Sequence, residues 1–337
     1  MEVFATEVGP GLPLRGRELV ERKEDRMSES IDGPYSPSAL PPLPLEDWRD
    51  TKETLHRYVQ IVGKVRLEYS PFRNHWWHVT LHVDPRGLSA RHMFSGELAF
   101  EISFDLIAHE LKVVTGAGDR ASFPLRDGLF VAEFYSKLVS ICETLGIEVD
   151  LSNPSPFDLE DEDRHFKEDT EHASYVEEYV ERYQRILTWV DHIFQEFSGR
   201  FNGKQSPVHL FWHGFDLAVT RFSGRRAPER EGADKVTRES YSHEVISFGF
   251  WAGDRDTPAP AFYSYTAPEP DSLTEQSLVP EAALWAPERG LALLMYDDVR
   301  QVASPRTTLL EFMQSAYEAG ARSAGWDVQD LRAEPVR

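Results

Sequence analysis

The stretch PVHLFWHGFDLAVTRFSG, residues 207–224, decides the fold. Apolar and polar residues alternate along much of it, which is the pattern of a strand with one buried face. The sequence therefore predicts a strand or a hairpin here. The stretch NHWWHVTLHVDPRG, residues 74–87, alternates in a similar way and ends in an Asp-Pro-Arg-Gly turn. Both stretches contain a Trp-His pair.

These two stretches occupy corresponding places in two halves of the chain. In each half an amphipathic helix comes first, then the strand with the Trp-His pair, then further strands, and finally a second helix. The predicted opening helices are 46–69 and 173–197, and the predicted closing helices are 128–147 and 304–327. Short matches such as EISFDL with VISFGF and AEFYSKLVS with LEFMQSAYE fall in the same order. We therefore predict an internal duplication of a helix–strands–helix unit.

This pattern predicts an α+β fold, with antiparallel sheets and helices packed to one side of them. Prolines and charged residues mark residues 1–40 as a mobile N-terminal tail. The first repeat is predicted at 41–155 and the second at 173–327. An acidic linker at 156–172 separates them, and a short tail covers 328–337.

Composition limits the classes of function. The chain has 337 residues, of which 41% are hydrophobic, and carries a net charge of −21. This charge repels phosphate backbones and anionic lipid surfaces, so we expect no nucleic-acid partner and no membrane partner. The single cysteine, Cys142, allows no intramolecular disulfide, and no apolar run is long enough to span a bilayer. We expect a cytoplasmic protein whose partner is a small molecule.

Several long stretches resemble those of a known family. They are RNHWWHVTLHV, FWHGFDLAVTRFSGR, SHEVISFGFWAGD, AFYSYTAPEP and EFMQSAYEAGARSAGWD. Together they resemble the bacterial family of uncharacterised proteins called DUF5996, over a region from about residue 40 to about residue 327. The resemblance implies one shared architecture. It implies no activity, cofactor or catalytic residue.

Histidines and carboxylates on the predicted strands are the candidate catalytic groups. If the Trp-His pairs correspond, His78 and His213 point into related space. Asp216 and Glu244 would be their carboxylate partners, because a carboxylate on an apolar strand face needs a partner or a raised pKa. For Glu244, an ion pair with Arg221 or Arg225 is the structural alternative.

Strand geometry limits any metal site. Side chains four residues apart in a strand are roughly 13 Å apart, whereas a metal holds nitrogen ligands at about 2 Å. His209 and His213 therefore cannot share an ion in a regular strand, and neither can His78 and His82. A metal would need ligands from different strands, for which the sequence offers His78, His213 and His243. The cofactor is left open, with a divalent metal as one candidate.

The leading hypothesis is a small-molecule enzyme with a His/carboxylate site in an aromatic pocket between the two halves. The predicted pocket residues share aromatic rings or hydroxyls, and they are Trp76, Trp212, Phe215, Trp251, Tyr263 and Tyr265. Metal-assisted chemistry and metal-free acid–base chemistry both remain open. The alternative is a non-catalytic small-molecule-binding protein that uses the same aromatic residues, and a structural or interaction protein is the third class. The sequence has no phosphate-binding loop, dinucleotide fingerprint or nucleophile elbow.

Overall fold

The structure is a computed structural model, and it describes residues 40–255 and 257–333. The predicted N-terminal tail lies outside the described residues except for Leu40. The described residues from Pro41 onward form one compact unit that contains both sheets. None of the helices in the described part of the chain is long and apolar enough to cross a membrane.

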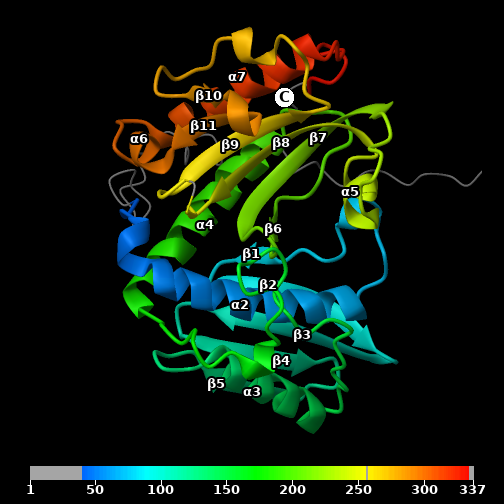
Figure 1. Cartoon of the computed structure of the whole chain (residues 1–337), viewed down its shortest axis with the longest axis vertical. Coiled ribbons are helices and arrows are strands. Elements are labelled where there is room, and N and C mark those ends of the chain that lie inside the picture. Colours follow the sequence, from blue (N-terminus) through cyan, green and yellow to red (C-terminus); the bar gives the residue numbers. More distant parts are fainter. Residues whose placement is uncertain (1–39, 256, 334–337) are drawn as a thin grey trace, which may run out of the picture. The chain divides into compact units, whose positions relative to one another are not determined.

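The first half consists of a five-stranded antiparallel sheet and two long helices (Figure 1). Helix α2 (Leu45–Tyr69) precedes the sheet and α3 (Val131–Thr144) follows it. The strands follow one another in space as in sequence: β1 (His82–Asp84), β2 (Gly87–Ser95), β3 (Leu98–Asp105), β4 (Glu110–Thr115) and β5 (Arg120–Pro124). A 3-10 helix, η2 (Asn74–Trp76), lies between α2 and β1.

Both helices of the first half pack on one face of this sheet. Phe134 of α3 stacks on Tyr58 of α2, with ring centroids 4.1 Å apart, and also contacts Phe104 and Phe123 of the sheet. These aromatic rings are buried and form the centre of the first core. Helix α3 ends at Thr144, and Gly146 just beyond it has a φ of 76°, which suits a residue without a Cβ.

The second half repeats this order with one added strand. Helix α4 (Glu177–Ser198) precedes a six-stranded antiparallel sheet, and α7 (Pro305–Ser323) follows it. The sheet order is β10-β11-β9-β8-β7-β6. The strands are β6 (His209–Phe211), β7 (Asp216–Arg226), β8 (His243–Trp251), β9 (Ala261–Ala267), β10 (Leu284–Ala286) and β11 (Leu291–Met295). Two short helices, α5 (Lys235–Ser240) and α6 (Tyr296–Arg300), and 3-10 helices η3 (Phe166–Glu168), η4 (Leu273–Glu275) and η5 (Pro287–Arg289) complete the described elements.

The α+β fold predicted from the sequence is confirmed. Residues 207–224 form the β6–β7 hairpin, and the predicted opening and closing helices of both halves are present. The strand predicted over 74–84 is wrong for most of its length, since only residues 82–84 are extended. His75 and Trp76 have φ values of 56° and 59°, and this left-handed backbone cannot continue a strand. The shared helix–meander–helix order fits a duplication, which stays a prediction.

The two sheets meet at their short first strands. Leu81 and Leu210 form an antiparallel bridge, with N–H to O distances of 2.9 and 2.8 Å. His82 follows Leu81, and His209 precedes Leu210. The ring centroids of these two histidines are 6.2 Å apart. The histidines that meet across this junction are therefore His82 and His209, at the starts of β1 and β6.

Helix α2 is buried around most of its circumference. Its inner side contacts β2 and α3, and it also contacts α4. At Gly63 the indole of Trp212 approaches so closely that an added Cβ would lie 2.3 Å from it. The Trp212 indole N–H donates to the Val79 carbonyl at 2.9 Å. The β6–β7 turn of the second half is thereby fixed against the helix of the first half.

Candidate anion-binding pocket

A cavity of about 710 Å³ lies beside the junction of the two sheets. One wall comes from the first half, from the last turn of α2 and from β2. The other wall comes from the second half, from the end of α4 and from residues 206–208 just before β6. The volume lies within the range of about 300–1,000 Å³ that is usual for small-molecule sites.

Three arginines from different segments line this cavity. Arg66 comes from the last turn of α2, Arg73 from the loop that follows α2, and Arg91 from β2. Each lowers the pKa of the His82 ring electrostatically, so their charges act in one region. Burial, with Arg73 and Arg91 nearby, also lowers the pKa of Arg66 to about 10.

Arg66 is the most buried of the three arginines. Its residue is 6% exposed, and one guanidinium nitrogen donates to the Ala90 carbonyl. Its Nε is buried and makes no hydrogen bond within the described part of the chain. A buried donor without an acceptor costs free energy, about 1–3 kcal/mol for a typical group. The fold therefore holds a charged donor in place at the cavity wall without giving it a full set of protein partners.

Arg91 lies on a distortion of strand β2. The pairing register of β2 with β3 shifts between Ser89 and His92, and Arg91 between them has a φ of 53°. The Ser89 hydroxyl accepts a hydrogen bond from the Arg91 backbone N–H at 2.7 Å, which stabilises this conformation. Bulges and left-handed residues of this kind occur often beside functional sites, because they redirect a side chain. Here the bulge places an arginine in the cavity wall.

Three histidines line the same cavity, namely His78, His82 and His92. Burial, together with the three guanidiniums, lowers the pKa of His82 to about 3. Burial lowers the pKa of His78 as well, while the Arg73 backbone N–H donates to its Nδ1 at 3.3 Å. Both rings are therefore neutral near pH 7, and the positive charge at the wall comes from the arginines.

No described residue that lines the cavity is acidic. Among the described residues, neither Arg66 nor Arg73 nor Arg91 is in an ion pair with a carboxylate. The carboxylate that interacts with Arg91 at longer range is Asp191 of α4, whose pKa burial raises to about 6. Arg73 and Arg91 are exposed to solvent, whereas Arg66 is buried, so the lack of a carboxylate partner is most costly at Arg66.

Part of the site predicted from the sequence forms a second cluster, at the other end of the β6–β7 hairpin. The Tyr263 hydroxyl donates to Asp216 Oδ2 at 2.5 Å, and the ring of Trp251 lies 5.0 Å from the Tyr263 ring. Tyr265 stacks beside Tyr263 with centroids 6.2 Å apart. Burial raises the pKa of Asp216, and the nearby His213 opposes this shift. Five of the predicted residues are thus neighbours.

The other predicted residues lie elsewhere. Glu244 accepts from Arg225 at 2.7 Å and from Ser223, so it makes the ion pair considered as its structural alternative. His243, which precedes it, begins β8, while Trp251 at the far end of β8 pairs with Asp216. Eight residues of strand separate these ends by roughly 26 Å. Glu244 therefore does not join Asp216 in one site.

The predicted aromatic residues are also divided. Trp212 packs on Gly63, and Phe215 stacks on His56 in the core with centroids 5.0 Å apart. Trp76 stacks on His78 at 5.2 Å, beside the arginine-lined cavity. His78 therefore belongs to that cavity, whereas the ring of His213 contacts Phe157 at 5.9 Å.

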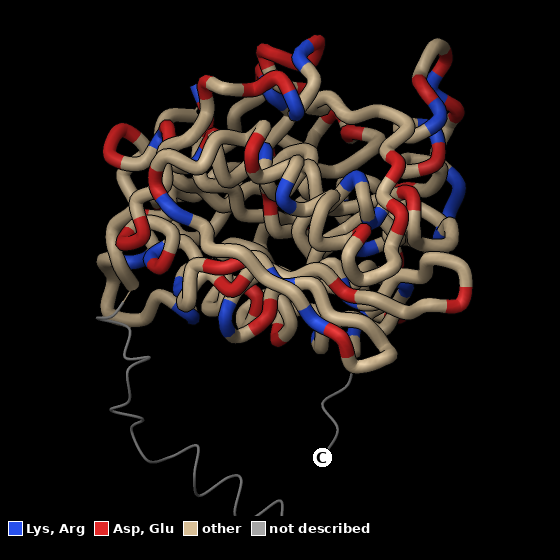
Figure 2. Tube along the Cα trace, turned by 90° about the horizontal axis from the view of Figure 1, so that it is seen from below, with Lys and Arg blue, Asp and Glu red and all other residues tan. Residues whose placement is uncertain are grey.

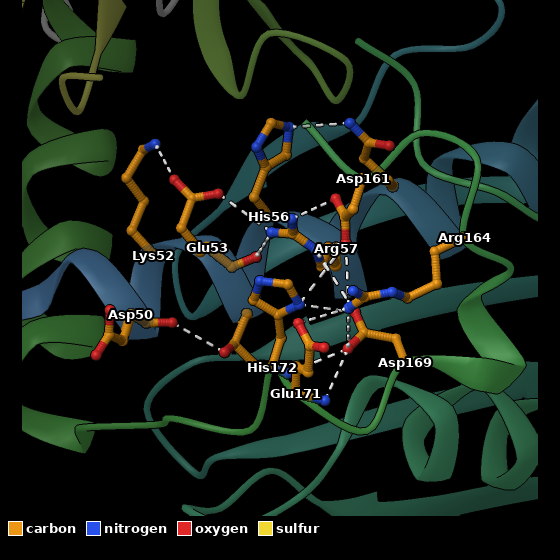
Figure 3. Close-up of polar contacts among 12 residues, drawn as sticks. Asp50, Lys52, Glu53, His56, Arg57, Asp161, Arg164, Asp169, Glu171 and His172 are labelled. Atoms are coloured by element: carbon orange, nitrogen blue, oxygen red, sulfur yellow. Dashed lines mark hydrogen bonds and ion pairs between the residues drawn. The ribbon is translucent and has the colours of Figure 1, made fainter. Parts of the chain in front are cut away.

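The predicted metal ligands His78, His213 and His243 do not form a metal-binding group. Across residues 40–255 and 257–333, the group with suitable spacing is Asp161, Asp169 and His172 (Figure 3). Two guanidiniums already occupy this group: Arg57 lies 2.6 Å from Asp161 and 3.6 Å from Asp169, and Arg164 also contacts both carboxylates. A cation would have to displace these charges.

The cluster in Figure 3 attaches the acidic segment to α2. Burial opposes ionisation of Asp169, but hydrogen bonds from the His172 ring and from the backbone of residues 171 and 172 lower its pKa to about 2. Asp169 is therefore ionised while 1% exposed, and Arg57, 4% exposed, is its compensating charge. The predicted linker is thus held to the first half by buried ion pairs.

Sequence reasoning missed the arginine-lined cavity. Its one visible signal is that Arg73 and Arg91 stand beside histidines, in RNH and ARH. Neither pattern is specific, and the convergence depends on the bulge at Arg91 and on the loop after α2, which residue spacing does not predict.

Comparison with known proteins supports one assignment. The model of a family of unknown function, DUF5996, matches residues 40–333. The chain belongs to this family. The resemblance seen in the sequence is therefore confirmed over nearly the whole chain. No curated protein and no solved structure matches this DUF5996 chain. The family carries no assigned activity, so the function of this member has to be argued from its own residues.

Arg57→Met tests the role of the cluster in Figure 3. Removing the guanidinium takes a buried positive charge away from both Asp161 and the buried, ionised Asp169, so we expect the free energy of unfolding to fall by about 3 kcal/mol. The measurement is urea unfolding followed by circular dichroism. The control is Arg164→Met. Arg164 contacts the same carboxylates from a more exposed position, so its removal should lower the free energy of unfolding by less than about 1 kcal/mol. Equal effects of both substitutions would contradict the assignment.

Proposed function

We propose that this DUF5996 protein binds a small anionic molecule in the cavity between its two halves. The observation that carries the proposal is the convergence of Arg66, Arg73 and Arg91 on one cavity without carboxylate partners in the described chain. Guanidinium groups recognise carboxylates and phosphates through paired N–H donors, and such charge-assisted hydrogen bonds are about twice as strong as neutral ones. This is the non-catalytic alternative considered from the sequence, with an anion as the ligand.

The charge of the wall favours an anion even when opposing charges are counted. The cavity lies at the C-terminal ends of α2 and α4, and each helix end contributes about half a negative charge. Three arginines bring three positive charges, and Asp191 adds one negative charge when it is ionised, so the balance stays positive by about one unit. In the view of Figure 2, acidic and basic residues are interspersed along the chain. The lining of this cavity differs from that mixture because it includes no acidic residue among those described.

The size of the cavity favours a small molecule over a polymer. Its volume suits one compact ligand, and the net charge of −21 opposes the approach of a polyanion such as nucleic acid. Arg66 is buried at the cavity wall, where salt screens its charge less than it screens an exposed charge.

A second candidate function is an enzyme that uses Asp216 for acid–base chemistry, as in the leading hypothesis from the sequence. The contact that favours it is the 2.5 Å hydrogen bond from Tyr263 to Asp216, beside His213. A carboxyl group with a raised pKa keeps its proton to a higher pH than an ordinary carboxyl group and can deliver it to a substrate. The candidate roles of His78 and Glu244 find no support in this cluster, because both lie elsewhere.

Anion binding is tested by titrating the protein with sulfate and inorganic phosphate in a calorimeter. We expect binding to the wild type, and an affinity about tenfold lower for Arg91→Gln, because one charge-assisted hydrogen bond is lost. The matched control is Arg120→Gln, which removes the same charge from an exposed position on β5, outside the cavity. Absence of binding in the wild type, or equal losses in both variants, would disprove the proposal.

The affinity for sulfate should rise as the pH falls from 8 to 6. Burial raises the pKa of Asp191 to about 6, and Arg91 is among the charges that act on this carboxyl group. Protonation of Asp191 removes a negative charge that opposes the bound anion, so the complex binds more protons than the free protein over this range. Sulfate keeps both of its charges throughout this range. Asp191→Asn should flatten the profile, whereas His82→Gln, which replaces a ring with a pKa of about 3, should leave its shape unchanged. A wild-type affinity independent of pH would contradict this linkage.

Asp216→Asn tests the acid–base candidate. A raised folded-state pKa makes the carboxyl favour folding at low pH, and this contribution is lost as the pH rises through that pKa. The wild type should therefore lose stability relative to the variant between pH 4 and pH 8, measured as the difference in free energy of unfolding. Asparagine keeps an acceptor for Tyr263, so the contact that positions the side chain survives. A difference that does not change with pH would show an ordinary carboxylate and remove the catalytic role.

A further inference from the structure

The mouth of the arginine-lined cavity carries aromatic side chains that the fold leaves uncovered. Phe94 lines the cavity and is 50% exposed, and Phe72 is 59% exposed beside it. Phe72 contacts His78, a lining residue, with ring centroids 5.2 Å apart. Full burial of a phenylalanine is worth about 1.5–3 kcal/mol, so the fold forgoes stabilisation at both positions.

The backbone beside these rings holds them in place. His75 and Trp76 both have left-handed φ values, a conformation that costs about 1–3 kcal/mol for residues other than glycine. This bend sets the Trp76 ring over His78, 5.2 Å away and inclined by 30°, and sets the edge of Phe72 against both rings. Flat surfaces therefore stand next to the charged wall.

The cavity is also much larger than an inorganic anion. Its volume of about 710 Å³ accommodates a drug-sized molecule, whereas the guanidiniums can contact only the charged group of a ligand. The remaining space adjoins a mixed lining. Its apolar residues are Phe94, Pro71, Pro207 and Val208, and its neutral polar residues include Ser70, Gln195, Ser198 and Ser206. A ligand that fills the site thus needs a charged end and an apolar body.

We propose that the ligand carries a doubly charged oxyanion on a planar, apolar body. The oxyanion, a phosphate monoester or a pair of carboxylates, contacts Arg66, Arg73 and Arg91, and the planar body lies against Phe94 and Phe72. A phosphate monoester or a pair of carboxylates offers several acceptor oxygens, so each of the three guanidiniums can donate to it. This inference rests on the proposed anion binding and specifies the class of ligand.

The test compares phenyl phosphate, phthalate and inorganic phosphate at pH 8 by calorimetry. We expect phenyl phosphate or phthalate to bind at least tenfold more tightly than inorganic phosphate. The tighter of the two identifies the oxyanion as a phosphate monoester or as a pair of carboxylates. The variant Phe94→Ala should lose about tenfold in affinity for that ligand and keep the wild-type affinity for inorganic phosphate. Phe130→Ala, another exposed phenylalanine outside the cavity, is the matched control and should change neither affinity.

The outcomes separate this inference from the proposed function. Equal affinities for inorganic phosphate and both aromatic anions, or no effect of Phe94→Ala on the aromatic ligand, would overturn the planar body and leave anion binding intact. Absence of binding by all three anions would overturn both. Because Phe94 is exposed, its truncation is not expected to impair folding, and an unchanged melting temperature checks this.

Discussion

The contact between Trp212 and Gly63 is the constraint on which the arrangement of the two halves depends. The indole occupies the place where any other residue of α2 would carry a Cβ, and its N–H donates to the Val79 carbonyl. His56 lies about two turns before Gly63 on α2, and its Nε2 bonds to the backbone carbonyls of Trp212 and His213. One face of α2 therefore holds the β6–β7 turn by packing and by hydrogen bonds. With that turn fixed, β6 reaches β1, and the walls of the cavity come together.

Helix α2 shows two ways of burying a positive charge. Arg57 is compensated by Asp161 and Asp169, so its guanidinium serves the attachment of the acidic segment. Arg66, about two and a half turns later, is almost as buried, but its acceptor is a backbone carbonyl, and it pairs with no carboxylate among the described residues. A buried charge without a counter-ion is costly, and its pKa falls accordingly. Arg57 has carboxylate partners and Arg66 has none, and this difference supports a role for Arg66 in ligand binding.

Sequence periodicity predicted the fold well because its signals are local. The helices and the β6–β7 hairpin follow from apolar spacing, and Gly146 closes α3 just beyond Thr144 as expected. The strand predicted over residues 74–84 failed because alternation does not reveal left-handed backbone at His75 and Trp76. Because of that error, the sequence analysis named the wrong first-half histidine as the one that meets a histidine of the second half. The sequence pointed to His78, whereas the histidine at the junction is His82, which faces His209.

The site was harder to predict because convergence is a property of tertiary structure. Asp216, Tyr263 and Trp251 could be grouped from the sequence, since antiparallel neighbours on one sheet face follow from alternation and register. The three arginines come from a helix end, a loop and a bulge, and no periodicity relates these places. An excess of acidic residues also directs attention away from basic groups, although a net charge describes the whole surface and not one recess.

The position of the cavity follows from the same junction that joins the sheets. Strands β1 and β6 are only three residues long, so the first sheet ends close to the bridge between Leu81 and Leu210. Beyond this bridge the segments before β1 and before β6 diverge, and they are the segments that supply His78 and residues 206–208 to the cavity. The short strands thus bring both halves into contact while leaving a recess beside the contact. A binding site at this seam would couple ligand binding to the relative position of the halves, because each half contributes one wall.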